Sequence, residues 1–350
     1  MKKNTRIKDI ALKAGVSIGT VDRVLHKRGE VSDETKAKIQ KIIDELDYRP
    51  NLLASSLASK KSVLIATLMP KAVSQDSYWV KPQLGVEKAM DQIKAYGVKI
   101  QQFYFEMDDS ASFSTEADKL LQASPDAVLL APWAKREALK FTGKLDEKRI
   151  PYIFIDATLP EAHPVSFVAQ SSVDSGFLAA KLIDWGVQPN SVLLLIHVAK
   201  ELDNANHLLQ RERGFLNYFE GNKNNHRIIK LEVSGNKEEE IAIHLSKLGI
   251  EPCEVSGIFV TNSKVHLAAA FFKTLCVSPK IIGYDLIPQN IALLKEGKID
   301  FLICQKPELQ GSHAIHLLFD YLVKKEKIRQ ENFTSIDLIT KENIDFYNSF

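Results

Sequence analysis

The sequence predicts a small all-α headpiece of helix-turn-helix type, followed by an α/β body of two doubly wound parallel-sheet subdomains. Residues 7–28 carry apolar side chains at helical spacing on either side of a glycine, which is typical of two short helices joined by a turn. From residue 62 onward, short and nearly continuous apolar runs alternate with amphipathic helical stretches, as in parallel sheets covered by helices. The body has about 290 residues, which exceeds one ordinary sheet unit, so we expect two subdomains.

The first two helices are expected within residues 7–28. The first helix presents one apolar face, which consists of Ile7, Ile10, Ala11 and Ala14, and Gly15 then interrupts it. Ser17 is a suitable N-cap for the second helix, whose inward side chains are Val21, Val24 and Leu25. Two short helices joined in this way pack at a steep angle and expose the second one. We therefore expect the outer face of the second helix to lie in a DNA major groove.

The outward positions of the second helix are the candidate DNA contacts. Ser17 and Thr20 are expected to hold phosphates, together with the lysines of the headpiece. Arg23 is expected to contact a guanine edge and Ile18 a thymine methyl group, whereas a glycine contributes no side chain. Asp22 is unusual at such a face, because phosphates repel a carboxylate unless it accepts from a cytosine amine or braces the arginine. The full set is Ser17, Ile18, Gly19, Thr20, Asp22, Arg23 and His26.

A third helix and a short fourth segment complete the N-terminal part. Ser32 is a suitable N-cap, and the two acidic residues after it favour a helix start. The apolar face of this helix consists of Ile39, Ile42, Ile43 and Leu46, and Tyr48-Arg49-Pro50 ends it. The segment NLLASSLAS after Pro50 has a helical apolar side, but a helix of about eight residues is unstable alone in water. We expect this segment to order only when a partner supplies contacts.

Composition and charge are those of a soluble globular protein with a basic N-terminal module. Apolar residues make up 45% of the chain and charged residues 26%. Residues 1–62 contain 14 Lys and Arg against 8 Asp and Glu, although the net charge of the whole chain is only +2. Such a module suits a polyanion such as nucleic acid.

The N-terminus lacks an apolar signal region, so we expect a cytoplasmic protein. The cysteines are expected to be small buried hydrophobic residues: Cys253, Cys276 and Cys304.

Polar side chains follow four of the apolar runs of the body. In open parallel sheets, ligands bind beyond the carboxyl ends of the strands, so the first polar residue after each run is a candidate contact. This rule selects Asp156, Asn262, Asp285 and Gln305. All four side chains form hydrogen bonds well with hydroxyl groups. They predict a polyhydroxylated or otherwise polar small-molecule ligand.

Two adjacent aromatic residues lie near the start of the first helix of the body. Tyr78 and Trp79 follow the run VLIATLM, and either ring can stack on the apolar face of a sugar. Packing of one of the two rings in the core is an equally good interpretation.

Two histidines, His313 and His316, are three residues apart on a predicted helix, but no further metal ligands occur at a suitable spacing. We therefore predict no metal and no other cofactor.

The N-terminal residues also resemble a known family. The stretch AGVSIGTVDRVLHKRGEVSDETKAKIQKIIDELDYRPNLLASSLASKKS is similar to the headpiece and hinge of lac repressor (LacI/GalR) family transcription regulators. Family members usually carry GVS-x-x-TVSRVLN, so Asp22 and His26 replace the usual Ser and Asn and leave the operator sequence open. The resemblance implies that NLLASSLAS is a hinge helix, that two copies pair in a dimer, and that Leu57 inserts between base steps of the minor groove. A plain linker with a buried leucine is the alternative interpretation.

The body resembles the periplasmic-binding-protein type I fold of ribose-binding proteins, up to about residue 330. DSYW is similar to their aromatic loop after the first strand, and YIFID, VTN, YD and CQ match strand ends whose polar residues contact ligand. QRERGF resembles a segment in which an arginine three residues before a glycine reaches the ligand, which implies Arg211. Such an arginine donates a fork of hydrogen bonds to vicinal hydroxyls, a carboxylate or a phosphate; a surface salt bridge is the alternative. Ala157 replaces the second arginine of several sugar binders, which argues against a pentose or a simple hexose.

These features predict three consecutive parts. Residues 1–49 form the DNA-binding headpiece, residues 50–61 the hinge helix or linker, and residues 62–350 the ligand-binding and dimerisation body. Within the body, we expect an N-subdomain of about residues 62–165 plus 301–330, and a C-subdomain of about residues 166–300 plus 331–350.

The combination predicts a ligand-responsive, sequence-specific DNA-binding transcription regulator that acts as a dimer on a palindromic operator. Its effector would be a sugar or a related polar small molecule. The body alone also fits a solute-binding protein for transport, but the sequence shows neither a secretory signal nor a lipid-anchor cysteine. A carbohydrate-active enzyme would use Asp156 and Asp285 as paired carboxylates, yet hydroxyl binding explains the same residues. We expect no catalysis and no membrane association.

Overall fold

The computed structural model describes most of the chain as two compact units, Met1–Lys61 and Ser62–Phe350. The described residues are 6–25, 29–46, 48, 62–107, 109–199, 206–221, 224–234, 238–275 and 277–347. His26, Cys276 and the expected hinge segment of residues 50–61 with Leu57 lie outside them. The two units are described separately below.

The N-terminal unit contains the three helices that the periodicity predicts. They are α1 (Ile7–Ala14), α2 (Ile18–Leu25) and α3 (Asp33–Glu45). Gly15 ends α1 with a left-handed φ of 68°, a conformation in which glycine has no steric penalty, and the chain can turn at once into α2. The buried core consists of Ile10, Ala11, Ala14, Val21, Ile39 and Ile42. The predicted inward faces of the three helices are therefore confirmed.

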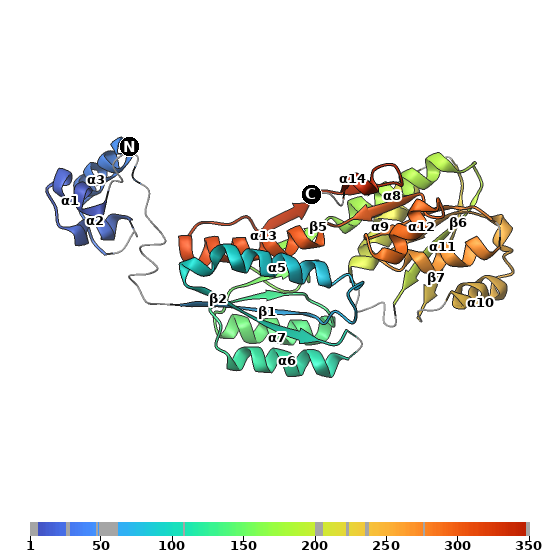
Figure 1. The fold of residues 1–350 in the computed structure, drawn as a ribbon, viewed down its shortest axis with the longest axis horizontal. Helices are drawn as coiled ribbons and strands as arrows, with labels where there is room; N and C mark the ends of the chain where they lie inside the picture. The colour runs from blue at the N-terminus through green and yellow to red at the C-terminus, as the bar shows by residue number, and fades with distance from the viewer. Residues whose placement is uncertain are drawn as a thin grey trace. The chain divides into compact units, whose positions relative to one another are not determined.

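The first sheet of the body is wholly parallel and has the strand order β11-β5-β4-β3-β1-β2. Helices α5 and α13 cover one face of this sheet, and α6 and α7 cover the other (Figure 1). We call this sheet with its four helices lobe A. Its elements are β1 (Val63–Pro70), α5 (Val80–Ile93), η1 (Lys94–Tyr96), β2 (Val98–Phe105), α6 (Ser110–Gln122), β3 (Ala127–Leu130), α7 (Lys135–Glu147), β4 (Tyr152–Ile155), β5 (Ser166–Gln170), α13 (Pro307–Phe319), η4 (Asp320–Lys324) and β11 (Glu331–Thr334).

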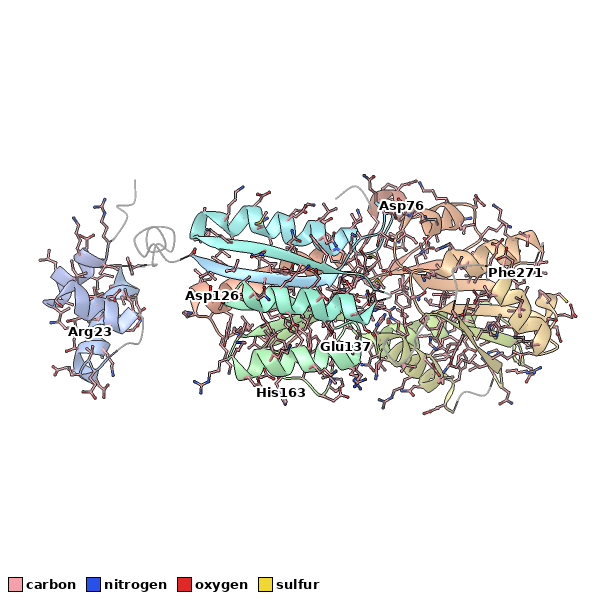
Figure 2. All side chains as sticks on the ribbon, turned by 90° about the horizontal axis from the view of Figure 1, so that it is seen from below. Arg23, Asp76, Asp126, Glu137, His163 and Phe271 are labelled. Atoms are coloured by element: carbon pink, nitrogen blue, oxygen red, sulfur yellow. The ribbon has the colours of Figure 1, made fainter. Side chains whose placement is uncertain are left out.

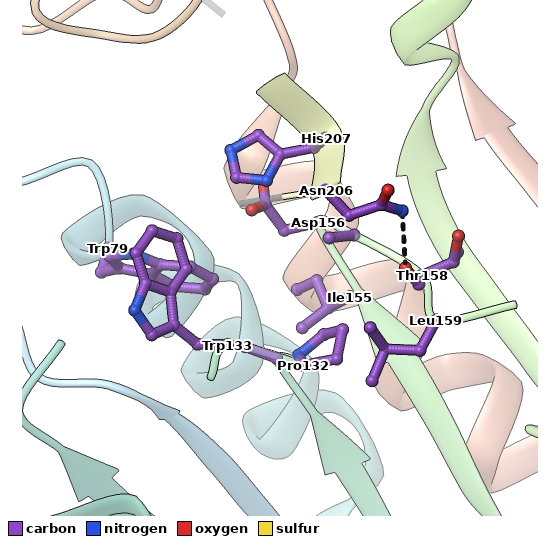
Figure 3. A pocket seen from close by; sticks show the side chains of 11 residues that line it. Trp79, Pro132, Trp133, Ile155, Asp156, Thr158, Leu159, Asn206 and His207 are labelled. Carbon is purple, nitrogen blue, oxygen red and sulfur yellow. Dashed lines mark hydrogen bonds between the residues drawn. The ribbon is translucent and has the colours of Figure 1, made fainter. Parts of the chain in front are cut away.

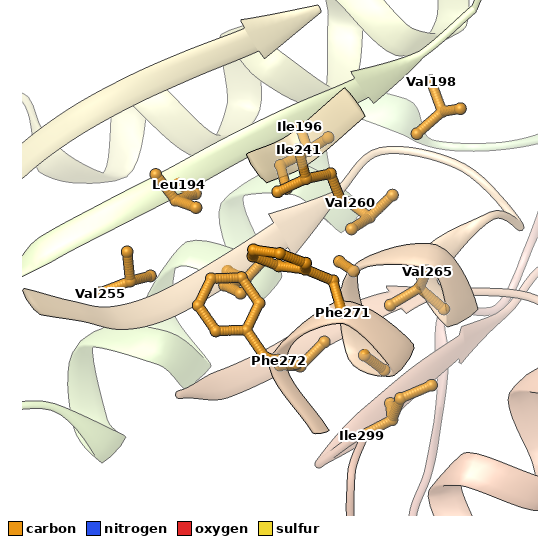
Figure 4. Packing of buried hydrophobic residues seen from close by; sticks show 14 of the residues in the cluster. Leu194, Ile196, Val198, Ile241, Val255, Val260, Val265, Phe271, Phe272 and Ile299 are labelled. Atoms are coloured by element: carbon orange, nitrogen blue, oxygen red, sulfur yellow. The ribbon is translucent and has the colours of Figure 1, made fainter. Parts of the chain in front are cut away.

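The second sheet has the order β12-β10-β9-β8-β6-β7 and is parallel except for its edge strand β12. We call this sheet with its helices lobe B. One side of it is built around Phe271 and Phe272 of α11, which pack among aliphatic strand residues (Figure 4). Its elements are α8 (Ser172–Gly186), β6 (Val192–Val198), α9 (Asn206–Phe219), β7 (Arg227–Val233), α10 (Glu239–Lys247), η3 (Pro252–Glu254), β8 (Val255–Val260), α11 (Val265–Thr274), β9 (Lys280–Tyr284), α12 (Pro288–Lys295), β10 (Phe301–Cys304), β12 (Asp337–Ile339) and α14 (Ile344–Tyr347). The predicted fold class, a helical headpiece with two doubly wound sheets, is confirmed.

The expected subdomain bounds of about residues 165, 300 and 330 each fall one short strand before the crossings that the two sheets show. Strand β5 belongs to lobe A, β10 belongs to lobe B, and β11 returns to lobe A. The chain therefore crosses between the lobes after Gln170, Cys304 and Thr334. The sequence does not mark these crossings, because an apolar run looks the same in either sheet. Only the backbone pairing of a strand decides to which sheet it belongs, and the partner can be distant in sequence. Glu331 of β11, for example, pairs with Phe167 of β5.

One cysteine also differs from its expectation. Cys304 is buried at the end of β10, as predicted, whereas Cys253 is exposed. Cys253 lies in the short 3-10 turn η3, which enters β8 from the surface, so the apolar strand that follows it does not cover the thiol.

Close packing of α8 on α9 fixes the position of α9 in lobe B. A Cβ atom added at Gly176 would lie 2.0 Å from the carbonyl oxygen of Arg211, and one at Gly214 would lie 1.9 Å from that of Val173. Only glycine permits this approach of the two backbones. The crossing therefore fixes the position of Arg211 relative to α8.

A search of the described residues for membrane-spanning helices found none with the length and apolar character that a bilayer requires.

Candidate functional site

Four of the predicted DNA contacts are exposed at or just before α2: Ser17, Ile18, Gly19 and Arg23. Ile18 is 55% exposed, and Arg23 is exposed on the surface of the headpiece (Figure 2). Ser17 Oγ accepts a hydrogen bond from the Thr20 amide at 3.1 Å, so the predicted N-cap of α2 is confirmed. The two hydroxyl groups lie 2.9 Å apart. Thr20 and Asp22 are half-buried at the side of this face.

In the body, two aspartates leave the carboxyl ends of equivalent strands with the same unusual backbone conformation. Asp156 follows β4 with φ 73°, and Asp285 follows β9 with φ 72°. The amide of Asp156 donates to the Val168 carbonyl, and that of Asp285 donates to the Ile303 carbonyl, each at 3.0 Å. Aspartate tolerates the left-handed region better than most residues. The strand-end rule thus found two positions that the two lobes use in the same way.

Arg211 of α9 joins Gln305 and Asp285 in a buried polar network of lobe B. The guanidinium is 2% exposed and donates through Nη2 to Gln305 Oε1 at 2.5 Å. Gln305 Nε2 donates in turn to both carboxylate oxygens of Asp285, at 2.9 and 3.0 Å. The guanidinium carbon lies 3.7 Å from the centre of the Tyr284 ring, a cation–π contact. Arg211 Nε is buried and has no hydrogen-bond partner among the described residues.

Burial controls the ionisation of both aspartates. It raises the pKa of Asp285 to about 7, against the opposing effects of Arg211 and Gln305, and Asp156 raises it further. Burial also raises the pKa of Asp156, while Tyr78 and Arg211 act to lower it. The Tyr78 hydroxyl donates to Asp156 Oδ1 at 2.6 Å. The cluster thus contains one fixed positive charge and two carboxyl groups that resist ionisation.

Two predicted ligand residues are partly engaged by the fold itself. Trp79 is 3% exposed and packs in the core of lobe A, edge-on to Tyr78 at 5.4 Å between ring centres. Asn262 follows β8, and its Nδ2 donates to the Val198 carbonyl at 2.7 Å while its Oδ1 accepts from the Lys264 amide at 3.1 Å. Their roles in ligand binding stay predictions.

The pocket beside Asp156 is lined partly by residues that the strand-end rule does not select, among them Trp133 and His207. Trp133 follows β3, and its indole Nε1 donates to the Met107 carbonyl at 2.9 Å. His207 lies in the first turn of α9, with its ring centre 6.1 Å from that of Trp133. The remaining space is about 10 Å³, near the least that holds one water molecule. Its walls are Trp79, Ala131, Pro132, Trp133, Ile155, Asp156, Ala157, Thr158, Leu159, Asn206 and His207 (Figure 3).

Two signals in the sequence point to these missed residues. Trp133 stands just after the apolar run DAVLLAP, so the strand-end rule selects it once aromatic residues are admitted. His207 precedes Arg211 by four residues and therefore shares its helix face. Burial, together with the charges of Arg211 and His197, lowers the pKa of His207 to about 3, so its imidazole is neutral. Among the described residues, no group of three or more His, Cys, Asp or Glu could hold a metal ion.

Known families match both units of the chain. Residues 6–51 match the model of bacterial regulatory proteins of the lacI family, and residues 65–326 match the model of the periplasmic binding protein domain. The ribose operon repressor of Lactococcus lactis is 50% identical over 66 residues, which cover 19% of this chain and 20% of that repressor. The sucrose operon repressor of Lactococcus lactis is 26% identical over 292 residues, which cover 80% and 82% of the two chains. Alignments with the first four curated relatives span between 20% and 55% of their lengths.

A solved structure supports the same relationship. A crystal structure described as that of a putative LacI transcriptional regulator from Bacteroides fragilis superposes with a TM-score of 0.75 and 29% sequence identity. The match covers 82% of this chain and 100% of that one. With both family models matched in sequence order, the chain belongs to the lacI family of bacterial regulatory proteins and carries a periplasmic binding protein domain as its body.

Proposed function

We propose that the chain is a ligand-responsive, sequence-specific DNA-binding transcription regulator. It acts in the cytoplasm as a homodimer on a palindromic operator, and its effector is a sugar or a related polar small molecule. The observation that carries this proposal is the presence, in one chain, of an exposed α2 face and of a buried polar cluster at the strand ends of a binding-protein body.

For the DNA-binding half, the exposed side chains of α2 supply both readout and positioning. Arg23 donates to a guanine edge, and Ile18 contacts a thymine methyl group. Ser17 and Thr20 lie at the start of α2, where hydroxyl and amide groups can hold a phosphate. A two-fold dimer presents two such helices, which requires two inverted half-sites in the operator.

For the effector half, the charges of the cluster favour a neutral polyhydroxylated ligand. Asp156 and Asp285 accept hydrogen bonds from hydroxyl groups, and the free donor of Arg211 supplies a bond in the other direction. An anionic ligand would lie beside two carboxyl groups and would be repelled by each of them whenever that group is ionised, with Arg211 as the positive charge that opposes this repulsion. Sugars and related polyols avoid this repulsion.

Two alternatives fit the geometry less well. A transport solute-binding protein has no use for a folded DNA-binding headpiece such as α1 to α3. In a carbohydrate-active enzyme, Asp156 and Asp285 would serve as acid and base. Here each carboxyl is held by a side chain of its own lobe, Tyr78 for Asp156 and Gln305 for Asp285, as suits fixed hydrogen-bond acceptors.

The test uses the full-length chain and a library of random DNA duplexes. Repeated selection is expected to enrich an inverted repeat, to which the R23A variant binds more weakly than the matched control R149A, which removes an exposed arginine of the body. The selected duplex is then titrated with and without D-ribose, D-xylose, D-glucose and D-galactose. Failure to enrich any sequence contradicts DNA readout. Sugar binding without any change in operator affinity contradicts the regulator and favours a solute-binding protein.

A further inference from the structure

A second buried polar cluster lies behind Arg211 in lobe B and takes no part in the site described so far. His197, near the end of β6, is 1% exposed. Its Nε2 lies 2.7 Å from Glu212 Oε2, and its Nδ1 lies 2.8 Å from Thr261 Oγ1. Glu212 also forms an ion pair with Lys230 of β7 at 3.1 Å. The imidazole thus connects β6, α9 and the residue that follows β8.

This cluster is connected to Arg211 at two points, through Glu212 and through Thr261. Glu212 is the next residue of α9, so its bond to His197 ties the arginine's own helix turn to β6. The carbonyl oxygen of Thr261 accepts from Arg211 Nη1 at 2.6 Å. His197 therefore touches both supports of Arg211, one that holds its backbone and one that holds its guanidinium.

The protonation of His197 follows from its neighbours. Burial lowers its pKa, and the hydrogen bond to Glu212 opposes this effect without reversing it. Because Glu212 is ion-paired with Lys230, the neutral imidazole donates through Nε2–H to this carboxylate. The Thr261 hydroxyl then donates to Nδ1 at 2.8 Å, which is closer than its second acceptor, the Ile196 carbonyl at 3.4 Å. The charged or titratable groups that face it are Glu212 of α9, Lys230 and Glu232 of β7, and His207.

The order hydroxyl, imidazole, carboxylate is also that of a hydrolytic triad, but burial excludes this role. Thr261 is fully buried, and His197 is nearly so, so no substrate reaches the hydroxyl. A closed hydrogen-bonded chain of this kind instead fixes the side chains at its ends.

We propose that His197 is a positioning residue of the effector site, which holds the Arg211 guanidinium in place through Glu212 and Thr261. The inference rests on the proposed function of the cleft and adds a residue that acts on the effector only through Arg211. Loss of His197 removes the hydrogen bonds that fix Glu212 and the Thr261 hydroxyl. The guanidinium keeps its bonds to Gln305 and to the Thr261 carbonyl, but these supports are then held less firmly.

The test measures sugar affinity of the full-length chain by isothermal titration calorimetry, with D-ribose, D-xylose, D-glucose and D-galactose as probes. H197Q is compared with the wild type and with the matched control H226Q. His226 is also a buried histidine of lobe B bound to a carboxylate, with its Nε2 2.8 Å from Asp184 Oδ1, and among the described residues neither of its ring nitrogens bonds to Arg211. We expect H197Q to weaken binding of the tightest sugar about tenfold, and H226Q to leave it unchanged. If H197Q does not fold, T261V, which removes only the hydroxyl partner, replaces it.

A pH series separates positioning from general destabilisation. Protonation of His197 reverses its bond with Thr261: Nδ1–H then donates to Oγ1, and the hydroxyl turns to the Ile196 carbonyl at 3.4 Å. This rearrangement disturbs the support of Arg211, so wild-type affinity is expected to fall as the solution becomes acidic. This part of the pH dependence is expected to vanish in H197Q and to persist in H226Q, while Asp285 titrates in all three proteins alike. Unchanged affinity in H197Q, or equal losses in both variants, overturns the inference and leaves the proposed function standing. Absence of sugar binding by the wild type overturns the proposed effector class, and the inference with it.

Discussion

Replacing Asp285 by asparagine removes a titratable group from the buried cluster while keeping its shape. The carboxyl is 4% exposed, and Gln305 Nε2 is its hydrogen-bond donor. Burial raises its pKa from 3.8 to about 7. Because the folded state holds this proton more tightly than the unfolded state, the resulting stabilisation is fully present below the unfolded pKa. It is lost as the pH rises through the folded pKa.

The size of the effect follows from the shift. About three pKa units correspond to roughly 4 kcal/mol by which ionised Asp285 destabilises the fold above pH 7. Asparagine retains one acceptor for Gln305 and loses the other, which costs about 1 kcal/mol. We therefore expect the free energy of unfolding of D285N to be about 3 kcal/mol higher than that of the wild type at pH 8, and slightly lower at pH 4.

Thermal unfolding of the full-length chain by circular dichroism between pH 4 and pH 8 measures this difference. At about 2 °C per kcal/mol, D285N is expected to melt about 6 °C higher at pH 8. Asp337 is the control of opposite sign. Burial acts to raise its pKa, but Ser335, Lys306 and Tyr347 together lower it, so D337N should lose stability at neutral pH. A melting difference for D285N that does not change with pH, or a loss at pH 8, refutes the reasoning.

Three further substitutions test other parts of the molecule. R23A should weaken operator binding by about 1–3 kcal/mol and relax one operator position in competition assays with single-base variants, whereas equal loss on every sequence contradicts base readout. L57A should weaken operator binding in gel shifts but leave sugar affinity unchanged, and an unaltered operator affinity rules out the hinge role. G214A would place a Cβ 1.9 Å from the Val173 carbonyl, so it should lower stability by about 1–3 kcal/mol in urea and weaken sugar binding through Arg211. Wild-type behaviour in both assays contradicts the packing argument.

The helices of the headpiece could be predicted because their signals are local. The apolar residues of α1 and the cap at Ser17 act within one or two helical turns, and the structure places them as expected. The strands of the body were also visible as apolar runs. Their distribution between the lobes could not be predicted, because it depends on backbone partners far apart in sequence, such as Phe167 for Glu331.

The candidate site also contains residues that could be predicted from the sequence and residues that could not. Asp156, Asp285 and Gln305 were found because parallel strands bring their carboxyl ends to one edge. The rule could not predict that Asn262 would bond to the backbone of Val198 at the end of β6 and of Lys264 in its own loop, because the first of these partners lies far away in sequence. It also passed over Trp133, because it considered only polar side chains.

Hydrogen bonds connect the cluster directly to the crossings between the lobes. Gln305 stands between β10 and α13, and its carbonyl accepts from Gln310 at 2.9 Å and from Thr334 at 3.2 Å. Gln170 donates to the carbonyls of Cys304 and Ser335, each at 3.0 Å, so all three crossings meet here.

An effector that bonds to Asp285 and Asp156 therefore acts on both lobes at the point where the chain passes between them. It can bias the lobes only by the difference in its affinity for their arrangements. Thermodynamic linkage then requires operator DNA to change sugar affinity by the same factor as sugar changes operator affinity. Calorimetry of sugar binding with and without saturating operator measures one factor, and gel shifts with and without saturating sugar measure the other. Factors of one in both assays would exclude coupling between the two sites.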